Sequence, residues 1–383
     1  MRDIPYKFLW IPHLKANSGS EMTGREYENW IERIFCRSSL SYPVLSVSVS
    51  GALAIIFLIL SVNVKWFPLN PWTLTELFSM SILVGFQIFG INYILSRAEH
   101  AFSKVVVASQ NSCDPGHIRS TFKEGVGSAK GYLMTVVPFM ALFILIKGVE
   151  LLQGLTHLFY LQEPTIWSAI LDFVNQAVSF INIFLLATMV WILLNTVRTL
   201  MTLSNTEYRR SLALDILCID RLGGLQQLRN YIVTSHVTYS IVIAFLVLSY
   251  VNPFSILYET YILLALYALS FYYVISSIGS IRKILRGHLE DQIERINEKY
   301  GRQHRKLLDL ISEENESDIE HEITRIKISL DTLYTERERL LSLYYQSKGY
   351  NPKTVVQFIS SFILPIIAIF EKIYLAVDVL FPK

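Results

Sequence analysis

Residues 281–345 read IRKILRGHLEDQIERINEKYGRQHRKLLDLISEENESDIEHEITRIKISLDTLYTERERLLSLYY. They form the only long polar segment of a chain that otherwise returns repeatedly to apolar sequence. Apolar side chains recur in two arms at intervals of mostly three or four residues. In the first arm they are Ile281, Leu285, Leu289, Ile293, Ile296, Tyr300, Leu307 and Ile311. In the second arm the corresponding positions hold Ile319, Ile323, Ile326, Leu330, Leu333, Arg337, Leu340 and Tyr344. This spacing keeps one stripe of a helix facing a partner helix and predicts a coiled coil.

The two arms are separated by residues 312–317, which read SEENES and contain no apolar residue. We predict that the chain turns there, so that residues 279–348 fold into an antiparallel hairpin. Arg337 occupies a position on the apolar seam. Antiparallel pairing places it near Glu290, Asp291 or Glu294 and predicts an ion pair that fixes the register.

The composition of the whole chain is that of a membrane protein. Of its 383 residues, 52% are hydrophobic and 17% are charged, and the mean hydropathy is +0.39. Soluble proteins have about 25% charged residues. Residues 1–43 are polar and contain no signal-peptide core, so the first span is expected to direct insertion.

Six apolar segments are long enough to cross about 30 Å of hydrocarbon. They cover residues 44–62, 77–95, 132–152, 166–194, 232–251 and 256–278. The predicted fold is therefore an all-α, polytopic bundle of about six spans.

Basic residues gather in residues 1–43, 97–130 and 196–230, on one side of the predicted bundle. The positive-inside rule then places both termini and the hairpin in the cytoplasm. All three cysteines (Cys36, Cys113 and Cys218) fall on the same reducing side. We expect the inner (plasma) membrane of a prokaryote.

The C-terminal segment, residues 349–383, is apolar again but difficult to interpret as a span. Residues 355–370 are short for a full crossing and contain Pro365. We expect a membrane-proximal helix packed under the bundle, and a complete crossing is the alternative.

The fourth predicted span carries an unusual number of polar side chains at spacings that place them on roughly one helical face. They are Asp172, Asn175, Gln176, Ser179, Asn182 and, farther along, Asn195. Because an unpaired polar group in lipid is costly, this face should turn inward. It lines a hydrated pore in one interpretation and joins helices by hydrogen bonds in the other. Other spans offer further candidates for the lining, namely Gln87, Asn92, Ser235, His236 and Thr238.

Charged side chains mark the predicted outer ends of two spans. Lys147, Glu150 and Asp172 could form an outer vestibule, or they could extend to the interface without further function.

Arg302, Arg305 and Lys306 lie half-way along the hairpin or farther, away from lipid. They are candidates for an anionic small molecule or an oligonucleotide, and a solvated face paired with glutamates is the alternative.

The loop before the fifth span contains Asp215, Asp220, Gly223 and Gly224. The glycines suit a structural elbow, and the acidic pair lacks the spacing of a calcium loop. The pattern D-x-x-x-x-D-x-x-G-G-L-x-x-L resembles one in a group of uncharacterised prokaryotic multi-span proteins. Those proteins have His-Pro before the second Asp, where this chain has Cys218-Ile219. The resemblance implies a coiled coil, a proline-containing linker and an apolar C-terminal helix, and it brings no known activity.

Signals of catalysis are weak. The sequence contains no phosphate-binding glycine loop, no nucleophile elbow and no spaced metal ligands, so no enzyme, cofactor or metal is expected.

The predicted function is an oligomeric channel or pore, assembled through spans and stalk and gated from the cytoplasmic stalk. A ligand-controlled effector of bacterial antiviral defence would fit this description. A membrane-anchored scaffold or receptor whose coiled coil recruits a partner, and a secondary transporter, are the alternatives.

Overall fold

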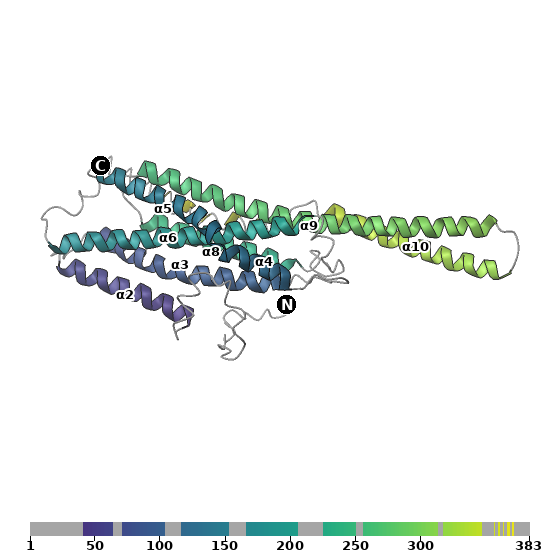
Figure 1. Ribbon diagram of the computed structural model, residues 1–383, viewed down its shortest axis with the longest axis horizontal. Helices are drawn as coiled ribbons and strands as arrows, with labels where there is room; N and C mark the ends of the chain where they lie inside the picture. The colour runs from purple at the N-terminus through teal and green to yellow at the C-terminus, as the bar shows by residue number, and fades with distance from the viewer. Residues whose placement is uncertain are drawn as a thin grey trace, which may run out of the picture.

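The computed structural model describes residues 41–63, 71–103, 116–152, 166–205, 225–249, 256–312 and 317–346, with seven separate residues between 356 and 370. Within these ranges the protein is all-helical, as predicted. The helices are α2 (Tyr42–Asn63), α3 (Pro71–Ser103), α4 (Gly116–Gly127), α5 (Ala129–Leu152), α6 (Ile166–Leu203), α8 (Gln226–Ser249), α9 (Ile256–Ser312) and α10 (Ser317–Gln346). Figure 1 shows a bundle from which α9 and α10 project at one end.

Among the described residues, four helices are long and apolar enough to cross a membrane. They are Tyr42–Asn63, Leu77–Ser103, Ile166–Leu203 and Gln226–Val247. A fifth candidate is the pair Ser120–Gly127 and Ala129–Leu145, which is bent by 48° at Ser128. The structure therefore has four or five candidate spans, and the sixth predicted span forms the first part of α9, where a crossing stays a prediction.

The sequence predicts a polar loop over residues 97–130, but residues 97–103 continue α3 and residues 116–127 form α4. The composition of α4 is polar, but Phe122 and Val126 lie one turn apart and are buried. Phe122 packs on Phe102 of α3, with ring centroids 4.9 Å apart. Tertiary packing of two apolar side chains therefore stabilises a helix that local composition does not indicate.

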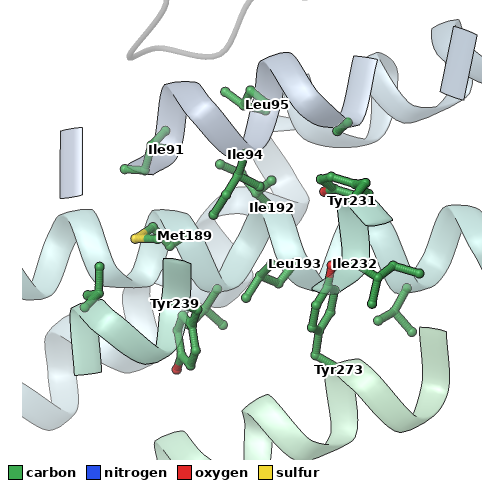
Figure 2. Close-up of a cluster of buried hydrophobic side chains, with 14 of the residues drawn as sticks. Ile91, Ile94, Leu95, Met189, Ile192, Leu193, Tyr231, Ile232, Tyr239 and Tyr273 are labelled. Atoms are coloured by element: carbon green, nitrogen blue, oxygen red, sulfur yellow. The ribbon is translucent and has the colours of Figure 1, made fainter. Parts of the chain in front are cut away.

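The core of the bundle lies where α3, α6, α8 and α9 meet. Figure 2 shows buried side chains from all four helices interdigitating, among them Ile94 of α3, Ile192 of α6, Ile232 of α8 and Tyr273 of α9. Within a bilayer, close van der Waals packing of this kind holds helices together, because lipid is as apolar as the side chains. Exposed apolar residues instead cover the outer faces of α2 and α5, as lipid contact requires.

Two glycines let helices approach closely. A Cβ added at Gly85 of α3 would meet the Ser50 hydroxyl and lie 2.6 Å from the Ser46 carbonyl oxygen of α2. A Cβ at Gly131 of α5 would meet the ring of Trp191 in α6. Small residues at such crossings allow the backbone of one helix to pack against another.

The helices α9 and α10 pair in antiparallel directions. Lys306 contacts Glu322 at 2.7 Å, and nearer the bundle the Tyr344 hydroxyl donates to Glu290 Oε1 at 2.9 Å. Between the helices, apolar side chains form a seam that includes Leu307, Ile326 and Leu330.

The predicted partners of Arg337 are wrong. Its Nε donates to Asn297 Oδ1 at 2.9 Å, and within its own helix it contacts Glu338 at 3.3 Å. The carboxylate of Glu290 faces Tyr344 instead. The register therefore differs by about one to two turns from the predicted one, because Asn297 lies opposite Arg337 in place of Glu290, Asp291 or Glu294.

The described residues of the C-terminal segment are helical and exposed. The apolar ones are Val356, Ile359, Ile363, Ile366, Ile367 and Phe370. Exposed apolar side chains of this kind suit contact with lipid.

Candidate functional site

The polar face of α6 is turned toward α3. Asn175, Ser179 and Asn182 are buried, with exposed fractions of 7%, 2% and 0%. The Ser179 hydroxyl lies 3.9 Å from the Met80 sulfur, and Asn182 Nδ2 makes a longer contact of 3.5 Å to the Met80 carbonyl oxygen. From α3, Gln87 Nε2 donates to the Asn182 carbonyl oxygen at 3.1 Å. The structure thus brings Ser179 and Asn182 together with α3, and Gln87 with Asn182.

The orientation of the amides follows from these contacts. A backbone carbonyl can only accept, so the NH₂ groups of Gln87 and Asn182 must point at it and their oxygens must point elsewhere. Within the described chain, Gln87 Oε1, Asn175 Oδ1 and Asn182 Oδ1 are buried and accept no hydrogen bond. Buried acceptors without a donor are uncommon and costly. We call these three amide oxygens, with Oδ1 of Asp172, the acceptor ladder.

Asp172 lies at the end of the ladder nearest the start of α6. Its Oδ1 is buried and has no hydrogen-bond donor among the described residues, while the residue as a whole is half-buried. Gln176, which follows one turn later, is also half-buried. From Asp172 to Asn182 the ladder rises about 15 Å along α6, at 1.5 Å per residue.

The predicted vestibule is described only in part. Lys147 of α5 is half-buried, with its ammonium 6.0 Å from the Phe143 ring centroid. The Glu150 side chain lies outside the described part of the chain. Neither the vestibule nor the interfacial alternative is decided by this contact.

Asn195 is separated from the acceptor ladder. Its Nδ2 donates to the Phe122 carbonyl oxygen of α4 at 2.9 Å, and its side chain fills the space beside Gly125. One turn earlier, Trp191 Nε1 donates to the Val126 carbonyl oxygen at 3.1 Å. This part of α6 therefore satisfies the C-terminal carbonyls of α4.

A second polar cluster lies between α6, α8 and α9, and sequence reasoning found only part of it. The Tyr231 hydroxyl lies 2.8 Å from Thr196 Oγ1, and the Tyr273 hydroxyl lies 2.6 Å from Ser235 Oγ. Figure 2 shows the two tyrosines facing one another across the core. The chain of hydroxyls ties three helices together.

His236 belongs to this second cluster, not to the acceptor ladder. Its Nδ1 lies 2.8 Å from Ser270 Oγ of α9. Thr238 faces α3, since a Cβ at Gly90 would lie 3.1 Å from its methyl group. Asn92 is half-buried on α3. The spacing of Tyr231 and Ser235, one turn apart on one face, could have revealed the cluster, but hydropathy counts tyrosine and threonine as nearly neutral.

The basic candidates on the hairpin are exposed and have acidic or backbone neighbours. Arg302 lies 3.8 Å from Glu298, Arg305 Nε donates to the Gly301 carbonyl oxygen at 3.3 Å, and Lys306 pairs with Glu322. These contacts are those of the solvated, paired face that the sequence allowed as the alternative.

Acid should weaken the contact between Lys306 and Glu322. The hydrogen bond from the Lys306 ammonium, followed by its charge, holds the pKa of Glu322 below its usual value. The contribution to stability is therefore present above the ordinary glutamate pKa and is lost as the pH falls through the lower folded value. Lys306→Gln should raise the Glu322 pKa, measured by NMR titration of the carboxyl carbon. Lys327→Gln is the charge-matched control, because Lys327 is exposed and lies on the same helix as Glu322. An equal shift of the Glu322 pKa in both variants would contradict a specific contact.

The elbow residues Asp215, Asp220, Gly223 and Gly224 lie outside the described residues, as do Cys36, Cys113 and Cys218. Within the described ranges, no group of three or more His, Cys, Asp or Glu side chains could hold a metal ion.

Comparison with known proteins gives no match to this chain among family models, curated proteins or solved structures.

Proposed function

We propose that the protein is an oligomeric membrane channel or pore, with the acceptor ladder of α6 and α3 as part of its lining. The observation that carries this proposal is the set of buried oxygens on Gln87, Asn175 and Asn182 that accept no hydrogen bond from the described chain. In lipid such groups are retained where water or a permeating species solvates them. The sequence favours a prokaryotic plasma membrane with both termini in the cytoplasm.

The continuity of α9 supports control from the hairpin. One uninterrupted helix of 57 residues runs from the bundle to the turn. It is held to α8 through Ser270 and Tyr273 and to α10 through Glu290. A change in the packing of the hairpin would therefore move α9 within the bundle without a loop to absorb the motion.

Cysteine accessibility tests the proposed lining. In a protein whose native cysteines are replaced by serine, Asn175→Cys and Ser179→Cys should react with a charged, membrane-impermeant thiol reagent, and the reaction should reduce current in planar bilayers. Phe173→Cys and Phe180→Cys are the matched controls, because those side chains are exposed on the apolar surface of α6 and should stay unreactive in lipid. Current that persists after full modification of Ser179→Cys would place the pathway elsewhere.

A scaffold is the second candidate, favoured by exposed apolar residues on the hairpin. Leu308, Ile311 and Ile328 are 53%, 56% and 62% exposed, and such side chains suit a protein partner. Purified protein that carries no current, together with a soluble partner that covers these residues, would favour the scaffold over the channel.

A further inference from the structure

We infer that the acceptor ladder binds and passes a partly dehydrated monovalent cation of the Na⁺ or K⁺ class. This inference rests on the proposed channel function and specifies its substrate. Its basis is chemical: the ladder presents four buried oxygen atoms that accept no hydrogen bond from the described chain, and such oxygens can replace the water around a cation.

The orientation of two amides favours a cation over an anion. The NH₂ groups of Gln87 and Asn182 are directed to backbone carbonyl oxygens of Asn182 and Met80. Their oxygens are turned away from these contacts, and oxygens of this kind replace the water around a cation.

The distribution of charge agrees with this selectivity. No lysine or arginine occurs in residues 71–96 of α3 or 166–197 of α6. The first basic residues beyond them are Arg97 and Arg198, whose guanidinium groups lie over the rings of Tyr93 and Trp191. The charged member of the ladder is the Asp172 carboxylate, at the opposite end of α6 from Arg198. A cation entering at Asp172 would therefore meet oxygen ligands and no basic residue of α3 or α6 until it has passed the ladder.

The ligand types favour a monovalent over a divalent ion. Ca²⁺ and Mg²⁺ sites depend on several carboxylates or on retained water, whereas the ladder has one carboxylate and three neutral amide oxygens. The ligands are also distributed along about 15 Å of α6, at 1.5 Å per residue. Successive weak sites of this kind allow an ion to leave as well as to enter.

The ion selectivity of reconstituted protein tests the inference. In planar bilayers with a KCl gradient, the reversal potential should move toward the equilibrium potential of K⁺. Replacing one acceptor, in Asn182→Leu or Gln87→Leu, should lower K⁺ conductance about tenfold or more, because a hydrogen-bonding group that solvates a charge is lost. Phe180→Leu, on the exposed surface of α6, should leave the conductance unchanged. A reversal potential at the chloride equilibrium value would overturn the inference and leave the channel proposal in place.

A binding measurement on the same preparations separates the two proposals. Na⁺ or K⁺ should raise the thermal unfolding midpoint of the detergent-solubilised protein relative to N-methylglucamine at equal ionic strength, because an ion that binds only the folded state stabilises it. Asn175→Leu should abolish this increase, and it removes an acceptor that bonds to no other described residue. A cation-dependent midpoint without current would keep the site and reject the channel. A midpoint independent of the cation in the wild type, with no cation current, would reject the cation site.

Discussion

Trp191→Ala should destabilise the bundle by about 3–5 kcal/mol, the usual cost of truncating a buried aromatic side chain. Trp191 is 1% exposed and fills the space against Gly131 of α5. Its indole nitrogen also donates to the Val126 carbonyl oxygen at the end of α4. The variant would leave both a cavity and an unpaired carbonyl at the point where α4 and α5 bend and pack against α6.

The measurement is the free energy of unfolding in bicelles, obtained by steric trapping. Trp167→Ala is the matched control, since Trp167 is on the same helix and is 43% exposed. It should change the free energy of unfolding by well under half the Trp191 value, because exposed sites tolerate substitution. Equal losses in the two variants would mean that α4 and α5 do not depend on Trp191.

Gly85→Ala and Gly51→Ala should have opposite effects on stability. An alanine Cβ at position 85 would meet the Ser50 hydroxyl and the Ser46 carbonyl oxygen of α2, the latter at 2.6 Å. Backbone cannot rotate away as a side chain can, so α2 would have to move outward, at a cost of about 1–3 kcal/mol. At position 51 an added Cβ meets nothing within 4 Å, and the gain in helix propensity should stabilise α2 by up to about 1 kcal/mol.

Thermal unfolding in detergent, with a distance measurement between labels on α2 and α3, would report both effects. Gly85→Ala should lower the midpoint and lengthen the distance, and Gly51→Ala should raise the midpoint and leave the distance unchanged. Stabilisation by both substitutions would show that α2 is not packed against α3 in the membrane.

Helix content was readily predicted, because long apolar runs and the spacing of residues 281–345 are local signals. The ends of the helices were harder to predict from the sequence. The helix α6 continues to Leu203, nine residues beyond the predicted span, because Thr196, Thr199 and Leu200 are buried there. Hydropathy marks where lipid begins, whereas tertiary packing decides where a helix ends.

For the candidate site, the sequence predicted only which residues share one face of a helix. Spacing showed that Asn175, Ser179 and Asn182 share one side of a helix, and the structure identifies α3 as the helix that covers them. Spacing could not separate Asn195, which shares that approximate direction but meets α4. It also could not give the register of Arg337, because spacing within one helix does not say which residue of the other helix lies opposite. Periodicity indicates which side is buried, and only the tertiary fold indicates what lies against it.

Because α9 is unbroken, the number of residues between the bundle and the hairpin fixes how the hairpin is rotated about the α9 axis relative to the bundle. At 3.6 residues per turn, one inserted residue would rotate everything beyond it by about 100° and advance it by about 1.5 Å. Tyr273 holds the helix to the bundle and Glu290 holds α10 to the helix in the hairpin, so one residue inserted between them would turn the hairpin as a unit relative to the bundle. Insertions of seven residues miss two full turns by only about 20° and would nearly preserve this orientation while lengthening α9. Between these two residues, only changes in length that nearly complete whole turns keep the orientation of the hairpin.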